Sequence, residues 1–424
     1  MFWNKHEETI SRKKLEELQL RRLRALLKNT SEHPVYKQYK NVRITKLSDL
    51  QKLPFTAKKD IQRFSGFEFF NSPIKDIVRV HSTAGTTSKP IMVGYTKKDI
   101  ATWSELAARI FAAGDLTTQD IVQNALNYGL FTEGLGMQLG VEKIGAAILP
   151  SGGNNTLRQI NLIQNLGVTA LLSTPSYAFQ IMGIADKHAL DIKNSKLKLG
   201  FFTSETWTEK MRQEIETAMK IKALDNYSLT EVFGPGIAYE CLHQNGMHVS
   251  EDHFIVEVID PVSEEVLSPG EKGELVFTTL TKQGFPVIRF RTGDISRLLP
   301  DRCSCGRTFQ RIERIAGRND DKFVINGIDI FPSQIKDVLG DEPYATFNYE
   351  IIIEREDHKD LLTVLVETPH LLQKHSQEIL LIEKEMSDRL RASVGVKVKI
   401  KLLKPGAIMR FSEKQKQVID TRRK

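Results

Sequence analysis

The chain has 424 residues, of which 40% are hydrophobic and 27% charged. This is the balance of an ordinary globular enzyme, and the length exceeds what one hydrophobic core holds, so we expect two or three domains. The net charge of +7 comes from 60 basic and 53 acidic residues intermingled along the chain, which argues against a dedicated nucleic-acid surface. The first 28 residues hold no apolar run that suits a signal peptide or a membrane span, and three cysteines are too few for a disulfide framework, so we expect a cytoplasmic protein.

The predicted elements begin with a helix over residues 11–27, where leucines recur at helical spacing and Ser11 is placed as the N-cap. In the middle of the chain, short apolar segments alternate with amphipathic ones. Strands are expected at 145–150, 168–175 and 197–202, and helices at 156–166 and 208–219. This strand–helix–strand order predicts a parallel sheet with helices on its faces.

From residue 253 the pattern changes to hairpins, with expected strands at 254–260 and 273–280 around a turn at 261–264. After residue 321 come expected strands at 350–356, 361–367 and 397–403 and a helix over 371–394. We therefore predict an α/β protein with a large N-terminal domain over 1–317. That domain combines doubly wound mixed or parallel sheets with a β subdomain at about 240–317. A small α+β C-terminal domain over 318–424 follows, with the boundary in the polar run 317–322.

The strongest local signal is the segment 81–90, His-Ser-Thr-Ala-Gly-Thr-Thr-Ser-Lys-Pro, directly after a strand-like run. Backbone N–H groups and hydroxyls of such a loop can donate to phosphate oxygens, while Lys89 supplies positive charge. The spacing is not that of the P-loop of nucleoside triphosphatases. Taken alone, the decamer fits a flexible Ser/Thr-rich loop equally well.

Two further segments suit a nucleotide. Tyr227, close to Thr230 and Glu231 at the end of a predicted strand, can stack on a base and place a carboxylate on Mg²⁺. Asp294, which follows Arg289 and Arg291 in the run Arg-Phe-Arg-Thr-Gly-Asp, can accept from vicinal ribose hydroxyls. Each alone also fits a plain strand end or an ion-paired turn. The order and spacing of all these motifs over about 250 residues would rarely arise by chance.

With these motifs the chain resembles the adenylate-forming superfamily of acyl-CoA synthetases, adenylation domains and luciferases, and within it the phenylacetate-CoA ligase group. The resemblance runs from Trp3 to about Asp420. It includes the segments 81–90, 128–136, 173–177, 228–236, 248–254, 273–282, 286–294, 317–321 and 331–335. It implies an enzyme that uses ATP and Mg²⁺ to turn a carboxylic acid into an acyl-adenylate. The acyl group then passes to coenzyme A, with AMP and pyrophosphate as the other products.

The resemblance also implies roles for individual residues. Those that would hold the phosphates are Ser82, Thr83, Gly85, Thr86, Thr87 and Lys89, with Thr86 counted as catalytic. Tyr227 and Thr230 would contact AMP, Glu231 would bind Mg²⁺ and Asp294 would bind the ribose. The residues that stand where the group usually has a Gly-Ala-Glu-Pro run along the adenine are Ser204, Glu205 and Thr206. Those that would line the acyl pocket, and so favour an aromatic or other flat acid, are Tyr128, Phe131 and Gly134.

The C-terminal domain is implied to be a mobile cap. Arg318 would approach the nucleotide from a hinge at Asp320, and Lys414 would bridge the reacting carboxylate and the α-phosphate. Lys416 competes with Lys414 for this role, because the run around them departs from the usual pattern of the group. A solvated basic tail is the plain alternative.

All three cysteines fall in the predicted β subdomain, which also contains His243, His248 and His253. Three cysteines and one histidine form a closed tetrahedral set for structural Zn²⁺, and some members of the phenylacetate-CoA ligase group look similar here. We expect the ligands to be Cys241, His248, Cys303 and Cys305. Because C-x-C is less common than C-x-x-C in such sites, three ordinary buried cysteines remain the alternative.

Two other functions stay open. The enzyme could load a carrier protein or adenylate another acceptor, as related synthetases that act on a deazaflavin cofactor do. Alternatively, the chain could be an inactive nucleotide-binding regulatory homologue, because Ala84, Ser204 and Glu413 depart from the pattern of the group. The expected partners are a small carboxylic acid, ATP and coenzyme A, without nucleic acid or membrane, and the chain is expected to be a monomer or a homodimer.

Overall fold

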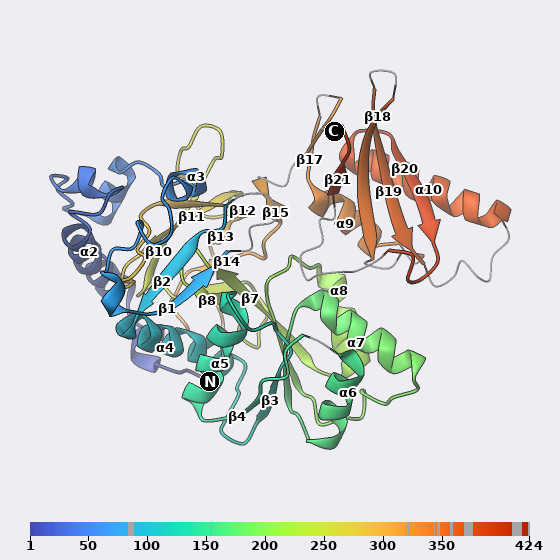
Figure 1. Cartoon of the computed structure of the whole chain (residues 1–424), viewed down its shortest axis with the longest axis horizontal. Helices are drawn as coiled ribbons and strands as arrows, with labels where there is room; N and C mark the ends of the chain where they lie inside the picture. Colours follow the sequence, from blue (N-terminus) through green and yellow to red (C-terminus); the bar gives the residue numbers. More distant parts are fainter. Residues whose placement is uncertain are drawn as a thin grey trace. The chain divides into compact units, whose positions relative to one another are not determined.

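The computed structural model describes residues 1–83, 89–153, 155–319, 323–326, 328–342, 344–345, 348–356, 359–368, 376–408 and 418–422 (Figure 1). The described chain divides into two compact units. The first comprises Met1–Glu205 and Glu214–Ile315, and the second comprises Thr206–Gln213 and Ala316–Lys424. Within the described residues, no helix has the length and apolar character needed to cross a membrane.

The first unit opens with helical segments that cover its β-rich part. The predicted N-terminal helix is confirmed as α2 (Arg12–Asn29), and Ser11 is its N-cap residue, although its side chain makes no capping hydrogen bond. The leucines at helical spacing are buried in the core. The other short helices here are α1 (Lys5–Glu8), η1 (Lys37–Tyr39), η2 (Leu47–Lys52), α3 (Lys58–Gln62) and η3 (Ile74–Asp76).

The centre of this unit is a sheet of nine described strands in the order β13-β14-β9-β8-β7-β6-β5-β3-β4. Strands β4, β3, β5, β6 and β7 run parallel, as the alternating pattern predicts, whereas β8, β9, β14 and β13 continue the sheet antiparallel. The bounds are β3 Ile121–Asn124, β4 Ala147–Leu149, β5 Ala170–Ser173, β6 Leu199–Phe202, β7 Lys222–Leu229, β8 Gly234–Tyr239, β9 Met247–Val249, β13 Leu298–Leu299 and β14 Arg311–Ile312.

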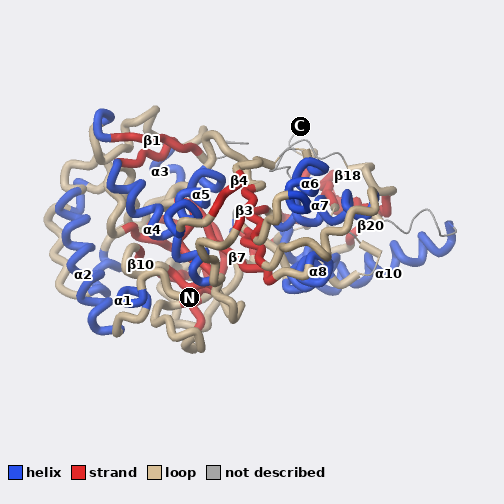
Figure 2. The backbone as a smooth tube through the Cα atoms, turned by 90° about the horizontal axis from the view of Figure 1, so that it is seen from below, coloured by secondary structure: helices blue, strands red, loops and turns tan. Residues whose placement is uncertain are grey.

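Helices cover both faces of the parallel part. Helices α4 (Lys97–Ala113) and α5 (Thr132–Ile144) lie on one side, and α6 (Thr156–Asn165) and α7 (Pro175–Lys187) lie on the other (Figures 1 and 2). Helix α8 (Glu209–Met219) follows β6. Trp103 of α4 stacks on Tyr95 with ring centroids 4.8 Å apart, and both side chains are fully buried. This aromatic pair belongs to a hydrophobic core of the first unit.

A second, antiparallel sheet contains β10 (Phe254–Ile259), β11 (Gly273–Thr279) and β12 (Phe290–Ser296). The predicted hairpin is therefore confirmed as β10 and β11, which pair in register from Phe254 with Thr279 to Ile259 with Glu274. A separate hairpin is formed by β1 (Ile77–Ser82) and β2 (Met92–Thr96), and its strands flank the loop of the 81–90 motif.

The second unit has its own apolar core between a sheet and two helices. The sheet order is β20-β19-β18-β21, with β18 and β19 antiparallel and the outer strands parallel to their neighbours. The bounds are β15 Gly317–Arg318, β16 Phe323–Ile325, β17 Ile328–Ile330, α9 Pro332–Gly340, β18 Tyr349–Glu356, β19 Lys359–Glu367, α10 Ser376–Val394, β20 Val398–Leu403 and β21 Val418–Asp420. The α+β pattern predicted after residue 321 is confirmed.

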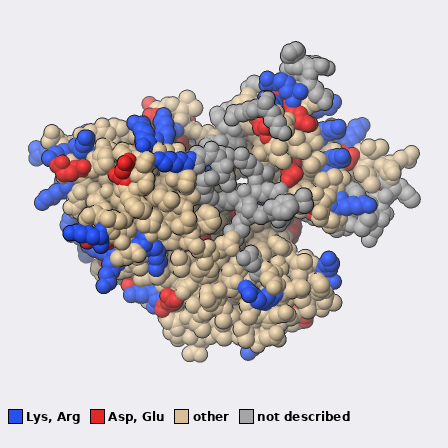
Figure 3. Space-filling model, in the orientation of Figure 1, with Lys and Arg blue, Asp and Glu red and all other residues tan. Residues whose placement is uncertain are grey.

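Charge is dispersed over the surface. On the face drawn in Figure 3, lysines and arginines are distributed over several elements with acidic side chains among them. This matches the intermingled charges of the sequence, and the described residues of that face form no continuous basic stripe of the kind that follows a nucleic-acid backbone.

Candidate active site

The carboxyl ends of four parallel strands bring the motif residues together. The loop after β3 carries Tyr128, the loop after β5 leads into α7, the loop after β6 carries Ser204 and Glu205, and the turn after β7 carries Thr230 and Glu231. Parallel strands end at the same edge of a sheet, and β7 is also the strand at which the sheet changes from parallel to antiparallel. Open α/β sheets bind ligands at such an edge.

Tyr227 and Asp294 form one side of the site. The Tyr227 hydroxyl donates to Asp294 Oδ2 at 2.6 Å, although the two residues lie 67 positions apart in the chain. The Tyr227 ring also stacks on Phe277, with centroids 5.8 Å apart. Both Tyr227 and Asp294 are nearly buried. The second sheet therefore brings the carboxylate expected at the ribose against the aromatic expected at the AMP.

Thr230 contacts the first turn of α5. The hydroxyls of Thr132 and Thr230 lie 2.9 Å apart, and both residues are buried. Gly134, two residues further along α5, is in close contact with the loop after β3. A Cβ added there would lie 2.3 Å from Asn127 O. The contact between Thr132 and Thr230 therefore joins the segment expected to line the acyl pocket to the motif expected to contact AMP.

Glu231 has a cationic neighbour that the sequence analysis did not single out. Lys58, at the start of α3, places its Nζ 3.5 Å from Glu231 Oε1, and the lysine side chain is 39% exposed. The Glu231 carboxylate itself is nearly buried. Mg²⁺ in nucleotide sites is commonly bound by one or two carboxylates together with phosphate oxygens, and the Glu231 carboxylate could serve as such a ligand.

Three buried oxygens at the ends of β6 and β7 lack a hydrogen-bond partner among the described residues. They are Thr203 Oγ1, Asn226 Oδ1 and Ser228 Oγ. Buried polar groups are normally hydrogen-bonded, so an unpaired set at one place indicates a missing ligand or water. Next to them Ser204 has φ of +74°, a backbone conformation that side-chain-bearing residues seldom adopt and that often marks a functional site.

The other two residues of the expected adenine segment have different surroundings. The Glu205 carboxylate accepts from Ser176 N at 3.1 Å and from Ser176 Oγ at 2.7 Å, at the first turn of α7. It therefore caps a helix N-terminus, where a negative charge is favoured. Thr206 begins the short segment that belongs to the second unit.

The phosphate-loop motif is described at its two ends. Ser82 N donates to Leu130 O at 2.8 Å, and Thr83 Oγ1 accepts from Ile91 N at 3.0 Å, which closes the base of the loop. Lys89 Nζ donates to Phe64 O and to Ser65 Oγ, both at 3.0 Å. The remaining predicted phosphate ligands, Gly85, Thr86 and Thr87, lie outside the described residues, as does Ala84.

The arginines that precede Asp294 are bound within the protein. Arg289 forms a buried two-point ion pair with Glu257 at 3.0 Å for each contact, and Arg291 contacts Glu274 at 2.6 Å. They therefore stabilise the β10–β12 sheet. Arg318 lies on β15 in the second unit. The predicted hinge Asp320, the departure Glu413 and the candidate catalytic lysines Lys414 and Lys416 lie outside the described residues.

The expected acyl-pocket residues differ in exposure. Tyr128 is half-buried, and its hydroxyl accepts from Asn124 Nδ2 at 2.8 Å. Burial raises the pKa of Tyr128 to about 12, so its hydroxyl stays protonated near neutral pH. Phe131, the N-cap residue of α5, is 37% exposed. This part of the chain therefore offers a partly exposed aromatic ring and a protonated hydroxyl.

The four expected zinc ligands lie together. Cys241 follows β8, His248 is on β9, and Cys303 and Cys305 belong to one tight turn. Their ligand atoms all lie within 4.8 Å of one another, with 3.7 Å between the sulfurs of Cys241 and Cys303 and 3.4 Å between Cys305 Sγ and His248 Nε2. Burial lowers the pKa of His248, which favours the neutral imidazole that binds metals.

Comparison with known proteins identifies this arrangement. Residues 16–280 match the model of the AMP-binding enzyme family, and residues 327–422 match that of the AMP-binding enzyme C-terminal domain. The chain belongs to the AMP-binding enzyme family. It is an AMP-forming acid–thiol ligase of the phenylacetate-CoA ligase type.

Relatives match the ligase over its full length. The phenylacetate-coenzyme A ligase of Aromatoleum evansii is 39% identical over 428 residues, which cover 98% of this chain and 97% of the relative. That of Escherichia coli (strain K12) is 38% identical over 426 residues, with the same two coverages.

Among solved structures, 2-hydroxyisobutyryl-CoA ligase in the postadenylation state with 2-HIB-AMP is 27% identical, with a TM-score of 0.92 and coverage of 100% of this chain and 93% of that one. The same protein with 2-HIB-AMP and CoA in the thioesterification state is 28% identical, with a TM-score of 0.73 and coverage of 99% and 92%.

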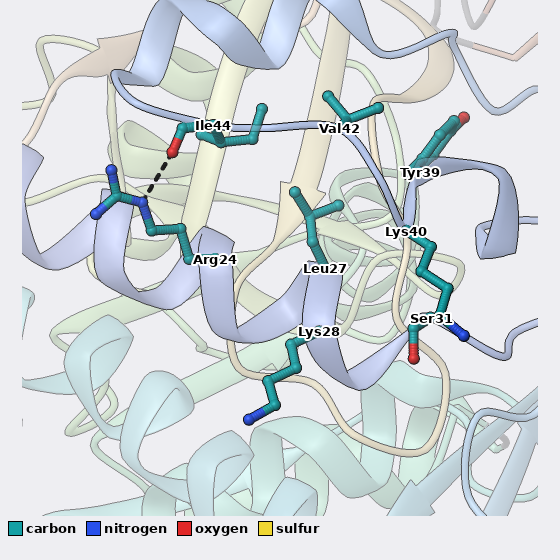
Figure 4. A pocket seen from close by; sticks show the side chains of 8 residues that line it. All are labelled: Arg24, Leu27, Lys28, Ser31, Tyr39, Lys40, Val42 and Ile44. Carbon is teal, nitrogen blue, oxygen red and sulfur yellow. Dashed lines mark hydrogen bonds between the residues drawn. The ribbon is translucent and has the colours of Figure 1, made fainter.

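A separate cavity of about 320 Å³ opens between α2 and the segment 37–44 of the ligase (Figure 4). Its lining is Arg24, Leu27, Lys28, Ser31, Tyr39, Lys40, Val42 and Ile44. Arg24 Nε donates to Ile44 O at 2.9 Å, and Lys40 pairs with Glu32 at 2.6 Å. Arg24 and Lys40 are thus already bound within the protein, and none of the motif residues lines the cavity. We therefore keep the candidate site at the strand ends.

Proposed function

We propose that this ligase activates an aromatic or arylacetic acid as its acyl-adenylate and transfers the acyl group to coenzyme A. The observation that carries the proposal is the convergence of two motifs at one strand end, where Tyr227 contacts Asp294 and Glu231 follows Thr230. The relatives of similar length act on phenylacetate by their names, which supports the aromatic class of acid. The partly exposed Phe131 and the neutral Tyr128 are consistent with that class.

In the first half-reaction the substrate carboxylate attacks the α-phosphorus of ATP, and the bond to pyrophosphate breaks. No protein nucleophile is needed, so the protein acts by positioning and by stabilising charge. Asp294 would hold the ribose hydroxyls, and Tyr227 would lie against the nucleoside. The unpaired oxygens of Thr203, Asn226 and Ser228 would complete the contacts to the base and sugar. Lys414 would neutralise the charge that develops between the carboxylate and the α-phosphate.

Magnesium would be held by Glu231, where it would neutralise phosphate oxygens of ATP. Lys58 would assist at the same place by lying between the carboxylate and the incoming phosphates. The phosphates themselves would lie in the loop that Thr83 closes at its base, with Thr86 and Thr87 as hydroxyl donors.

In the second half-reaction the thiol of coenzyme A attacks the acyl carbonyl, and AMP leaves. We propose that the C-terminal domain over 318–424 turns about Asp320 between the two half-reactions, so that Lys414 leaves the site when the thiol arrives. Support comes from 2-hydroxyisobutyryl-CoA ligase, which is known in both a postadenylation and a thioesterification state. Asp320→Pro should then spare adenylation and slow thioester formation, because proline fixes φ at the hinge.

We further propose a structural zinc ion at Cys241, His248, Cys303 and Cys305. Tetrahedral zinc with Zn–S bonds of about 2.3 Å and Zn–N bonds of about 2.0–2.1 Å spaces two sulfurs by roughly 3.8 Å, and a sulfur and a nitrogen by roughly 3.6 Å. The separations of 3.7 Å and 3.4 Å in the cluster are close to these values. Such thiolate ligands persist in a reducing compartment, which is consistent with a cytoplasmic enzyme.

A pyrophosphate-release assay tests the proposed acid and acceptor together. A panel of benzoic, arylacetic and fatty acids is supplied with Mg²⁺ and ATP, with and without coenzyme A. The proposal requires turnover with an aromatic acid, and multiple turnover only when coenzyme A is present. Release that a carrier protein stimulates, but coenzyme A does not, would reassign the acceptor. Absence of pyrophosphate with every acid would leave an inactive nucleotide-binding homologue.

A further inference from the structure

Lys282, three residues after the end of β11, is a buried lysine with an unusual environment. It is 3% exposed, and it forms no ion pair with any described carboxylate. Lysine is seldom buried without a charged partner, because an ammonium loses its hydration on leaving water. A buried lysine at this position therefore suggests a role other than packing.

The Lys282 ammonium contacts aromatic rings and not a described carboxylate. Lys282 Nζ lies 4.2 Å from the ring centroid of Tyr95, 5.0 Å from that of Phe233 and 5.5 Å from that of Phe285. Burial lowers the pKa of Lys282 to about 7, and the charges of Asp99 and Glu231 act in the opposite direction. The π faces of the rings also favour the ammonium over the neutral amine.

The rings of Tyr95, Phe233 and Phe285 form an aromatic cage around Lys282, and this cage is hydrogen-bonded to the turn that carries Glu231. Lys282 Nζ donates to Val232 O at 3.2 Å, and the hydroxyl of Tyr95 donates to Phe233 O at 2.8 Å. Trp103, which stacks on Tyr95, donates from Nε1 to Pro235 O at 2.9 Å. Three buried side chains therefore hold carbonyls of residues 232, 233 and 235, immediately after Glu231.

We propose that Lys282, together with Tyr95, is a positioning residue for the magnesium-binding carboxylate of Glu231. The proposal rests on the role of Glu231 given under the proposed function. By fixing the carbonyl of Val232, the ammonium fixes the backbone on which Glu231 stands. The rings of Tyr95, Phe233 and Phe285 keep the ammonium in place without a described carboxylate that would compete for its hydrogen bond to Val232 O.

Removal of the donor should therefore weaken metal–nucleotide binding more than folding. Lys282→Met keeps the length of the side chain and fills the cage, but it has neither charge nor donor. Tyr95→Phe keeps the ring and removes the donor to Phe233 O alone. Lys272→Met removes an exposed lysine before β11 and serves as the matched control. The readouts are binding of Mn²⁺–ATP by electron paramagnetic resonance, the Mg²⁺ dependence of adenylation, thioester formation from supplied acyl-AMP and coenzyme A, and Tm.

Lys282→Met should weaken Mn²⁺–ATP binding and raise the half-saturating Mg²⁺ concentration at least tenfold, and Tyr95→Phe should shift both in the same direction. Thioester formation from supplied acyl-AMP should stay within threefold of wild type, because that step uses no metal–ATP complex. Folded Lys282→Met with wild-type Mn²⁺–ATP affinity overturns the proposal. If Lys282→Met does not fold, a wild-type affinity of Tyr95→Phe for Mn²⁺–ATP overturns the proposal instead. If the wild type adenylates no acid, the proposed function fails, and the Mn²⁺–ATP arm still decides the role of Lys282.

Discussion

Replacement of one cysteine of the Cys₃His cluster should cost the protein its zinc and part of its stability. The contact between Cys241 and Cys303 joins residues that are 62 positions apart in the chain. A covalent or metal cross-link that closes a loop of this length restricts the unfolded chain by about 4 kcal/mol in the loop-entropy model. The three remaining ligands can still bind zinc weakly and so keep part of the cross-link. We therefore expect Cys303→Ser to lower the free energy of unfolding by roughly 2–4 kcal/mol.

The assay combines metal analysis with thermal unfolding. At about 2 °C per kcal/mol for a domain of this size, the expected fall in Tm is roughly 4–8 °C. Wild-type protein purified without chelators should contain one zinc per chain, and Cys303→Ser should contain little. Ser304→Ala changes the residue between the two cysteines of the same turn and should keep both zinc and Tm. A strong chelator should lower the Tm of the wild type and leave that of Cys303→Ser unchanged.

This reasoning fails if wild-type protein contains no stoichiometric zinc and its Tm does not respond to the chelator. The cluster would then be three buried cysteines and a histidine that pack without a metal. An equal loss of Tm in Cys303→Ser and Ser304→Ala would also contradict it, since the effect would then belong to the turn and not to a ligand.

Three further predictions concern the nucleotide site. Lys58→Ala should raise the KM for ATP and slow adenylation by roughly ten- to a hundredfold, because it removes the cation beside the magnesium-binding carboxylate, whereas Lys59→Ala on the exposed side of α3 should leave both unchanged. Glu231→Gln should slow adenylation by about one to three orders of magnitude, and a wild-type rate would remove Glu231 from the site. Lys414→Ala should abolish acyl-AMP formation and still convert supplied acyl-AMP to the thioester. If Lys416→Ala shows that phenotype instead, the catalytic lysine is two residues further along the chain.

The order of secondary structure could be predicted from the sequence because each element carries its own periodicity. The strands at 170–173 and 199–202 are short, continuous apolar runs between amphipathic helices, and a buried parallel strand has that pattern. The hairpin from 254 to 279 was likewise marked by two strand-like runs around a polar turn. The described residues confirm both patterns.

Candidate site residues could be named from the sequence only where the side chain has a functional group that suits a particular ligand. Glu231 was singled out because a carboxylate at the end of a strand suits a metal ion, and Asp294 because a carboxylate can accept from ribose hydroxyls. Lys58 was not, since its pairing with Glu231 spans 173 positions and depends on how α3 folds over the strand ends. Nothing in the local pattern indicated that Lys89 would donate to Phe64 O and Ser65 Oγ.

The same limit applies to the internal partners of other residues that the sequence motifs contain. Glu205 was expected along the adenine, and its carboxylate caps α7 through Ser176. Arg289 was noted as a cation close to Asp294 in the sequence, and it pairs with Glu257 on β10 of the second sheet. Tertiary packing decides between an available ligand and an internal partner, and a linear pattern holds no information on that choice.

The measurement that tests the central claim most directly is the fate of ATP when the purified chain is given an aromatic acid. With Mg²⁺, ATP, phenylacetate and coenzyme A, we expect AMP, pyrophosphate and the acyl-CoA thioester in equal amounts. Without coenzyme A, about one equivalent of pyrophosphate per site and a bound acyl-adenylate should form. Release of ADP and phosphate instead, or no consumption of ATP with any acid of the panel, would contradict the account.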